Sequence, residues 1–218
     1  MAVQNYGYLK TLWDAFLPWL NNNEYGVAGL MGNLYAESGC VPFRVQGDMT
    51  FPFTFSTNYT QNVDNGTIGR YAFCHNGPNG GGYGLAQWTY YTRKETLFDR
   101  WQNGSYTSIG DINLAIDQIK AEISGTAYNN TLYVLQNATS IAEASDKVLV
   151  DYENPKDQSA AVKALRQQYA TDIYNMYSGG GGSPDPPTPD PPPPPYPVDP
   201  TAKRNMPVWM MIKPNQHY

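Results

Sequence analysis

Charged residues are scarce in this sequence, and they are not concentrated anywhere along it. Asp, Glu, Lys and Arg make up 15% of the 218 residues, whereas about a quarter is usual in soluble domains. The formal net charge is −5, and no run of basic residues occurs. Because nucleic acids are bound through clusters of Lys and Arg, we expect no nucleic-acid partner.

Long apolar runs are also missing. No stretch reaches the roughly 18 apolar residues of a membrane-spanning helix, so no membrane partner is expected. The first 23 residues lack a basic start and a continuous apolar stretch, and Asp14 interrupts them. We therefore predict no signal peptide.

Cysteine and histidine are rare. The chain has Cys40 and Cys74, neither in a CxxC pair, and His75 and His217, too few for a His-rich zinc site. We expect no metal and no cofactor. The two cysteines could form one disulfide or remain free buried thiols. A cysteine peptidase built on Cys40 and His75 is disfavoured, because Cys40 would follow a helix C-terminus, where a thiolate is destabilised.

Neutral polar residues take the place of charge. The sequence is rich in Asn, Gln, Ser and Thr, and it contains 18 tyrosines. Aromatic rings stack on sugar rings, and amides and hydroxyls bond to sugar hydroxyls, so this composition suits a neutral polymer such as a glycan. It is equally consistent with a surface that only keeps a low-charge protein soluble.

A segment rich in Gly and Pro divides the chain near its end. Four glycines give flexibility, and the prolines that follow favour an extended left-handed helix without a core. We therefore predict a domain over 1–178, a linker over 179–200 and a short tail over 201–218. The linker is expected to be a tether, although a proline-rich ligand for a recognition domain is an alternative. The PVWMMI patch of the tail could dock on another protein, pair as a strand with another subunit, or stay disordered.

Apolar residues recur at three- and four-residue steps through much of the domain, as on the buried face of a helix. Asn21–Asn23 and Gly39 are typical residues for ending the first two helices. The form S-x-x-E at 140–143 indicates the start of another helix, which Pro155 would stop. Helices are thus predicted over 9–20, 24–38, 92–102, 112–123, 140–154 and 162–176.

Residues 41–83 follow a different pattern. The run FPFTFSTNYT, residues 51–60, alternates apolar and polar residues, and turn formers occur at 64–66 and 76–82. We expect short strands and loops here. The predicted fold class is α+β, mostly helical with a small region of strands and loops.

One carboxyl group has a position that favours acid chemistry. Glu37 lies near the predicted C-terminal end of the helix over 24–38, where the helix dipole disfavours a negative charge and raises a carboxyl pKa. Partial burial beside Leu34 or Tyr35 would act in the same direction. A general acid needs such a raised pKa near neutral pH. The alternative is an ordinary surface glutamate. The enzyme interpretation itself would fail if this side chain lay away from any groove or were locked in an ion pair with Lys or Arg.

The stretch GGGYGLAQWT over 80–89 could contact a sugar. Gly84 allows close approach of the backbone to a ligand, and Gln87 can both donate and accept hydrogen bonds. Tyr83 or Trp88 could stack on a sugar ring. The alternative is a glycine-rich turn with Trp88 in the core, which we favour for that residue.

Together the two stretches resemble the tail-tip lysozymes of bacteriophages. The pattern is G-x-x-G-N-x-x-x-E-S at the end of a helix, then G-x-G-L-x-Q-W-T. Residues that match it are Gly29, Gly32, Asn33, Glu37, Ser38, Gly82, Gly84, Leu85, Gln87, Trp88 and Thr89, with Tyr152, Glu153 and Pro155 in a later element. The resemblance spans most of 9–178. It implies a lysozyme-like α+β fold, cleavage between N-acetylmuramic acid and N-acetylglucosamine, Glu37 as proton donor, and Ser38 among the substrate-binding candidates.

Glycoside hydrolysis normally uses a second carboxyl group. We rank Asp48 first, since it follows Glu37 by eleven residues and lies where the opposite lip of a cleft is expected. Asp64 and Glu153 are the other candidates, and for Glu153 we expect a structural role at the junction before the last helix. Without a second carboxyl group, a lytic transglycosylase becomes attractive, because it also carries the E-S and G-L-x-Q elements. A wall-binding or structural tail module without activity is the non-enzymatic alternative.

The resemblance further implies a place in the phage virion, as a tail component that acts on the bacterial cell wall. The expected partners are the glycan strands of peptidoglycan and, through the tail at 201–218, other phage tail proteins. A stiff tether could project the enzyme from a tail structure. Action only at the lysis stage stays open.

Overall fold

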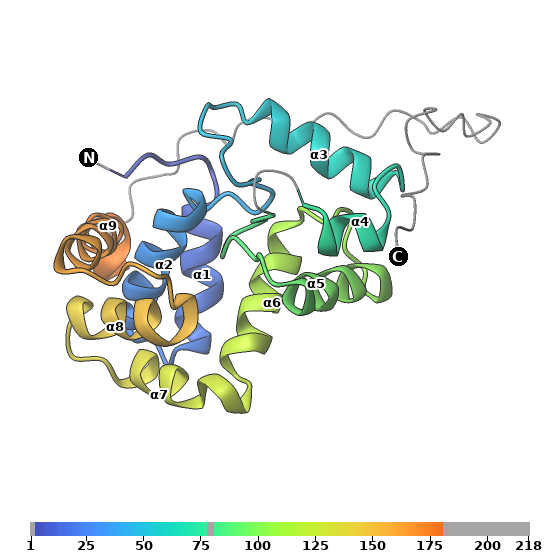
Figure 1. Cartoon of the computed structure of the whole chain (residues 1–218). Helices are drawn as coiled ribbons and strands as arrows, with labels where there is room; N and C mark the ends of the chain where they lie inside the picture. Colours follow the sequence, from blue (N-terminus) through green and yellow to red (C-terminus); the bar gives the residue numbers. More distant parts are fainter. Residues whose placement is uncertain (1–2, 78–80, 181–218) are drawn as a thin grey trace, which may run out of the picture.

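The computed structural model describes residues 3–77 and 81–180, and the regular structure of this part is helical (Figure 1). Its elements are α1 (Leu9–Trp19), α2 (Glu24–Ser38), α3 (Thr54–Asp64), α4 (Arg70–His75), α5 (Tyr91–Asn103), α6 (Ile112–Ile123), α7 (Asn129–Asn137), α8 (Ile141–Lys147), the π-helix η3 (Val148–Glu153) and α9 (Ala160–Tyr177). Short 3-10 turns cover Thr126–Tyr128 and Ser178–Gly180. Within the described ranges, β pairing is limited to two isolated bridges from Tyr83, to Val45 and to Trp88.

The predicted linker over 179–200 and tail over 201–218 lie outside the described residues, apart from Gly179 and Gly180. The proposals made for them therefore stay predictions. In the part of the chain that is described, no helix combines the length and apolarity needed to cross a bilayer.

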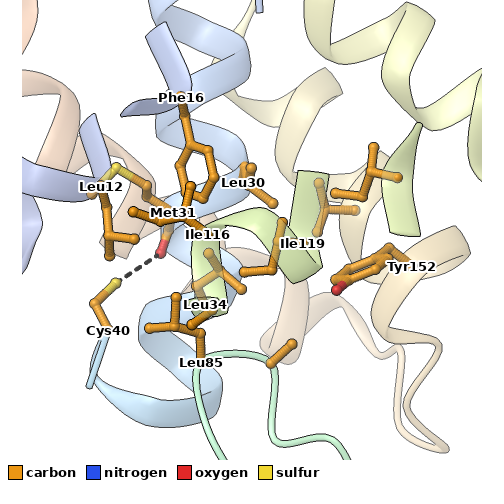
Figure 2. Close-up of a cluster of buried hydrophobic side chains, with 14 of the residues drawn as sticks. Leu12, Phe16, Leu30, Met31, Leu34, Cys40, Leu85, Ile116, Ile119 and Tyr152 are labelled. Carbon is orange, nitrogen blue, oxygen red and sulfur yellow. Dashed lines mark hydrogen bonds between the residues drawn. The ribbon is translucent and has the colours of Figure 1, made fainter. Parts of the chain in front are cut away.

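Helix α2 lies at the centre of one group of helices, in contact with α1, α7, α8 and α9 (Figure 1). Helices α4 and α5 contact each other in a second group, and α6 connects the two groups because it contacts both α5 and α7. The core combines side chains of α1, α2 and α6 with Leu85 and Tyr152 (Figure 2). Leu85 thereby anchors the loop between α4 and α5 against the end of α2.

Helix α2 has well-defined ends and unusually close neighbours. The Asn23 side chain accepts a hydrogen bond from the Gly26 amide, and Gly39 ends the helix in a left-handed conformation at φ 67°. A Cβ atom at Gly29 would lie 2.5 Å from the Cβ of Ala144 in α8, and one at Gly32 would lie 2.6 Å from the Cβ of Ala170 in α9. The two motif glycines thus allow α8 and α9 to lie directly on α2.

The six helices predicted from apolar spacing are confirmed, and α4 and α7 are additional. The prediction of strands over 51–60 is wrong, because Thr54–Asp64 forms α3. The buried face of α3 consists of Ser56, Thr60 and Val63, which are spaced as on a helix but are mostly polar. Phe55 is 46% exposed, so the alternating phenylalanines did not mark a buried strand face. The described part is therefore helical rather than α+β.

Candidate active site

A cavity of about 750 Å³ lies beside the C-terminal end of α2. Its walls come from the last turn of α2, the loops over 44–49 and 86–90, Arg93 of α5, the end of η3 and Tyr169 of α9. The residues that line it are Gln4, Tyr6, Tyr35, Ala36, Glu37, Gly39, Arg44, Val45, Gln46, Gly47, Met49, Ala86, Gln87, Thr89, Tyr90, Arg93, Glu153, Pro155 and Tyr169. Two carboxyl groups, Glu37 and Glu153, therefore belong to the same cavity.

Glu37 faces this cavity as predicted, but it has a cationic partner. Its Oε1 accepts a hydrogen bond of 2.5 Å from Nη2 of Arg166 in α9, and the two side chains are 22% and 9% exposed. The structure thus places Glu37 in the wall of a cavity, as expected, but also in the ion pair with Arg that was expected to count against the enzyme interpretation.

Asn33, one turn before Glu37 on α2, positions Arg166. The buried Asn33 side chain donates to the carbonyl oxygens of Gly29, at 2.9 Å, and of Ser145, at 3.0 Å. These bonds leave its Oδ1 to accept from Nη1 of Arg166 at 3.2 Å. Sequence reasoning missed Arg166, although a motif asparagine four residues before Glu37 was a signal that a polar partner shares this helix face.

Glu153 has the opposite environment. It ends η3 and lines the cavity, while its Oε1 is buried without a hydrogen-bond partner among the described residues. Burial, and next the charge of Glu37, raise the pKa of Glu153 to about 8, against the opposing charges of Arg93 and Arg166. The neutral form is therefore favoured at neutral pH.

A charged pair beside Glu153 fixes its neighbours. Nη2 of Arg93 bonds to Oε2 of Glu122 at 2.7 Å, and the hydroxyl of Tyr152 donates to the same oxygen at 2.5 Å. The Arg93 guanidinium also lies 4.8 Å from the centre of the Tyr152 ring. Burial raises the pKa of Glu122, but the bonds and charge of Arg93 outweigh it and hold that pKa below its ordinary value. Glu122 thus stays charged.

The other candidates for a second carboxyl group have structural partners. Oδ2 of Asp48 accepts from the amide of Ser56 at 2.8 Å and from its hydroxyl at 2.7 Å, in the first turn of α3. The Asp64 carboxylate accepts from the Ser108 hydroxyl and the Ile109 amide. Neither Asp48 nor Asp64 is among the residues that line the cavity. The structure brings Glu153, rather than Asp48, to the same space as Glu37.

Of the predicted substrate-binding residues, Gln87 alone is in the cavity lining. Its Nε2 donates to the carbonyl oxygens of Arg44 and Gly84, so only its amide oxygen could serve a sugar hydroxyl. Tyr83 is buried, and its hydroxyl bonds to that of Thr60 at 2.8 Å. The expected stacking of Tyr83 on a sugar ring is therefore wrong.

Ser38 and Gly84 also have structural roles. The buried Ser38 hydroxyl donates to the carbonyl oxygens of Leu34 and Leu85, which ties the end of α2 to the following loop. Gly84 adopts φ 76°, and a Cβ atom there would lie 2.7 Å from the ring of the buried Trp88. The motif glycine thus serves packing against Trp88, whose predicted place in the core is confirmed.

Both cysteines are free and buried. Burial raises the pKa of Cys40 far above its ordinary value and that of Cys74 to about 11. Their thiolates are therefore disfavoured, which is a further argument against the cysteine-peptidase alternative. The described residues contain no cluster of three or more potential metal ligands of the His, Cys, Asp or Glu type.

Comparison with protein families adds an independent finding. The family model described as phage tail lysozyme matches residues 8–177, a range that includes every helix of the described part from α1 to α9. No curated protein and no solved structure matches the chain.

Proposed function

Because the chain belongs to the phage tail lysozyme family, we propose that it is a muramidase that hydrolyses the β-1,4 bond between N-acetylmuramic acid and N-acetylglucosamine in peptidoglycan. The observation that carries this proposal is the presence of Glu37 and Glu153 in one cavity. Glycoside hydrolases use such a pair. One group protonates the leaving oxygen, and the other acts as a carboxylate on the sugar that becomes positively charged.

The lining of the cavity supports a neutral sugar polymer as the substrate. Tyr6, Tyr35 and Tyr90 contribute aromatic rings, and Gln46 and Gln87 contribute amides. Tyr90 is 75% exposed, so its ring is accessible to a sugar at the edge of the cavity. Rings and amides together match the apolar face and the hydroxyl groups of a hexose.

The second carboxyl group favours hydrolysis over lytic transglycosylation. A transglycosylase needs one acid, which then accepts a proton from the muramic 6-hydroxyl. Here Glu153 shares the cavity with Glu37, and burial raises the pKa of Glu153 to about 8, so a second carboxyl group lies in the same cavity. The cleaved glycan distinguishes the reactions, because hydrolysis leaves a reducing end and transglycosylation leaves a 1,6-anhydro end.

We assign the muramidase to the phage tail, where it would open the host cell wall. The family match supports this location. Mass spectrometry of purified phage particles would test it: detection of the chain in tail fractions supports the assignment, and its presence only in lysates contradicts it.

The catalytic proposal is tested with the full chain on purified sacculi of several wall chemotypes. Reducing ends should appear, and Glu37→Gln should lower their release by roughly 100-fold or more, because a neutral amide replaces the charged group. Glu143→Gln is the matched control, since Glu143 is exposed at the start of α8. Circular dichroism should show that both variants fold. A Glu37→Gln variant with full activity would overturn the proposal.

A further inference from the structure

Two arginines line the cavity, and they differ in how their charge is balanced. Arg93 forms an ion pair with Glu122 at 2.7 Å. Arg44 instead donates to the carbonyl oxygens of Asp48 and Ser38 and to the sulfur of Met49, and it forms no ion pair with any carboxylate of the described residues. The carbonyl end of a helix such as α2 supplies only about half a negative charge. The positive charge of Arg44 is therefore not fully balanced by the described part of the chain.

The Arg44 side chain is held in a fixed orientation. Its Nε donates to the Asp48 carbonyl and its Nη1 to the Ser38 carbonyl, both at 2.9 Å. The guanidinium carbon lies 4.8 Å from the centre of the buried Phe53 ring, a stacking contact that fixes its plane. Because Ser38 directly follows Glu37, these contacts hold the cation beside the motif glutamate before any ligand binds.

Part of the guanidinium group remains available to a ligand. Of its five N–H donors, the three contacts use one on each nitrogen. One N–H on Nη1 and one on Nη2 therefore have no acceptor among the described residues. The contact with Met49 Sδ, at 3.3 Å, is to a weak acceptor in a residue that is 75% exposed, so Met49 can give way to a better one. Two donors on one planar group match the two oxygens of a carboxylate.

Apolar side chains lie next to this cation at the protein surface. Met49 and Phe51 are 75% and 50% exposed. The ring of Tyr6, which lines the cavity, stacks on Phe51 with 5.7 Å between the ring centres. Exposed apolar side chains that lie together are typical of an interaction surface. A cation beside them suits a carboxylate on a chain with aliphatic groups, such as a short peptide, better than it suits a small inorganic anion.

We propose that Arg44 binds a carboxylate of the lactyl-peptide arm of muramic acid and makes the chain specific for glycan strands that carry this arm. This inference rests on the proposed muramidase function. The sugar whose C1–O bond would be cut is the muramic unit, which carries the arm at C3. In intact strands the carboxylate belongs to the stem peptide. Where the stem has been removed, the lactyl group itself ends in a carboxylate.

The experiment uses the full chain on soluble glycan strands, with stems and after removal of the stems by an amidase. Each type is used as isolated and after conversion of its carboxylates to neutral amides with carbodiimide and ammonia. Neutralisation should lower the wild-type kcat/KM by roughly 10- to 100-fold, mainly through KM, as loss of a charge-assisted hydrogen bond does. Arg44→Gln should lose the same factor on untreated strands and nothing more on neutralised ones.

Two further variants serve as controls. Arg44→Lys keeps the charge but not the two parallel donors, so its kcat/KM on untreated strands should lie between those of the wild type and Arg44→Gln. Lys10→Gln removes a positive charge from an exposed side chain of α1 outside the cavity lining and should behave as the wild type. Because each variant is compared with itself on two substrates, a smaller folded fraction cancels from the ratio.

The outcomes identify the carboxylate or overturn the proposal. An effect of neutralisation that depends on Arg44 and appears on strands with stems assigns the contact to the stem peptide, and one that appears only on strands without stems assigns it to the lactyl group. If neutralisation changes kcat/KM of the wild type and of Arg44→Gln by the same factor, or changes neither, Arg44 binds no carboxylate, while the muramidase proposal still stands. If the wild type releases no reducing ends from any strand, the muramidase proposal itself fails. Co-sedimentation with untreated and neutralised sacculi then still reports whether Arg44 binds a carboxylate.

Discussion

The last turn of α2 and the end of η3 each bring one glutamate to the same cavity. The two glutamates differ in whether a cationic or hydrogen-bonding partner contacts the carboxyl group. At α2, Glu37 contacts a buried guanidinium group that Asn33 holds in place. At η3, Glu153 has a buried oxygen without a hydrogen-bond partner among the described residues. The comparison shows that the state of a carboxyl group is set by contacts from distant segments more than by its place on a helix.

The helix dipole illustrates this point. Glu37 lies at a helix C-terminus, where the dipole disfavours negative charge by about 0.3–1 kcal/mol. A direct charge-assisted bond to Arg166, at 2.5 Å, is stronger than that effect. One cavity thus holds two carboxyl groups with different contacts, one in an ion pair with Arg166 and one with an oxygen that has no hydrogen-bond partner among the described residues.

Removing the cation on the Glu37 side should have a large effect on stability. Arg166→Met would leave Glu37 and Asn33 without their shared donor, and it should lower the free energy of unfolding by roughly 3 kcal/mol. Arg166→Lys keeps the charge and should lose less. The pKa of Glu153 should rise further in Arg166→Met, because the charge of Arg166 opposes its increase. Urea unfolding measures the stability change, and an unchanged midpoint would show that the ion pair contributes nothing.

A second effect concerns the pH dependence of stability on the Glu153 side. The folded protein binds the Glu153 proton up to a pH of about 8, whereas the unfolded chain releases it near 4.5. The free energy of unfolding should therefore fall between these values as pH rises, by up to about 1.4 kcal/mol per pH unit. Glu153→Gln should remove this loss, so its melting temperature should exceed that of the wild type at pH 8 by several degrees. If the melting temperatures of wild type and Glu153→Gln changed in parallel from pH 5 to 9, the raised pKa of Glu153 would be contradicted.

A smaller effect on stability is expected for Asp48, a carboxyl group whose partners are structural. Asp48 accepts two hydrogen bonds from Ser56 in the first turn of α3. Asp48→Ala should cost about 1 kcal/mol of stability, as loss of a helix cap does, and leave the turnover number within a few-fold of the wild type. A thermal melt measures the change in stability, and kinetics on glycan strands measure the turnover number. A 100-fold loss of turnover in a folded Asp48→Ala variant would instead support Asp48 as the second catalytic carboxyl group.

The smallest effect is expected at the exposed edge of the cavity. Tyr90 is accessible and has no part in the carboxyl pair, so Tyr90→Ala should raise KM several-fold through lost stacking and leave kcat nearly constant. Tyr90→Phe keeps the ring and should behave as the wild type. Stability should change by less than about 0.5 kcal/mol. A kcat effect larger than the KM effect would mean that Tyr90 acts on the chemistry.

Much of the fold could be predicted from sequence because apolar spacing reports burial directly. The helix over 9–20 carries its buried apolar residues on one face. The helix over 24–38 is instead buried on nearly every side, and Gly39 marks its end with a left-handed conformation. Helix α3 could not be found this way. Its buried positions hold Ser56 and Thr60, whose burial depends on hydrogen bonds to Asp48 and Tyr83.

The site was predictable in its residues but not in their charges. The E-S motif located Glu37, and the Y-E-x-P element contained Glu153, which we expected to be structural. Arg166 lies 129 positions after Glu37 in sequence, so no local pattern could reveal the ion pair. The unpartnered oxygen of Glu153 is likewise a product of packing between η3 and distant segments.

The most direct test of the account is the protonation state of Glu153 itself. Infrared spectroscopy of the wild type at pH 7 should show the carbonyl stretch of a protonated carboxyl group. This band should be lost in Glu153→Gln, persist in Glu143→Gln, and disappear at a lower pH in Glu37→Gln than in the wild type. If no such band is present at pH 7, or if it belongs to Glu37, the assignment of one charged and one neutral carboxyl group to this cavity is contradicted.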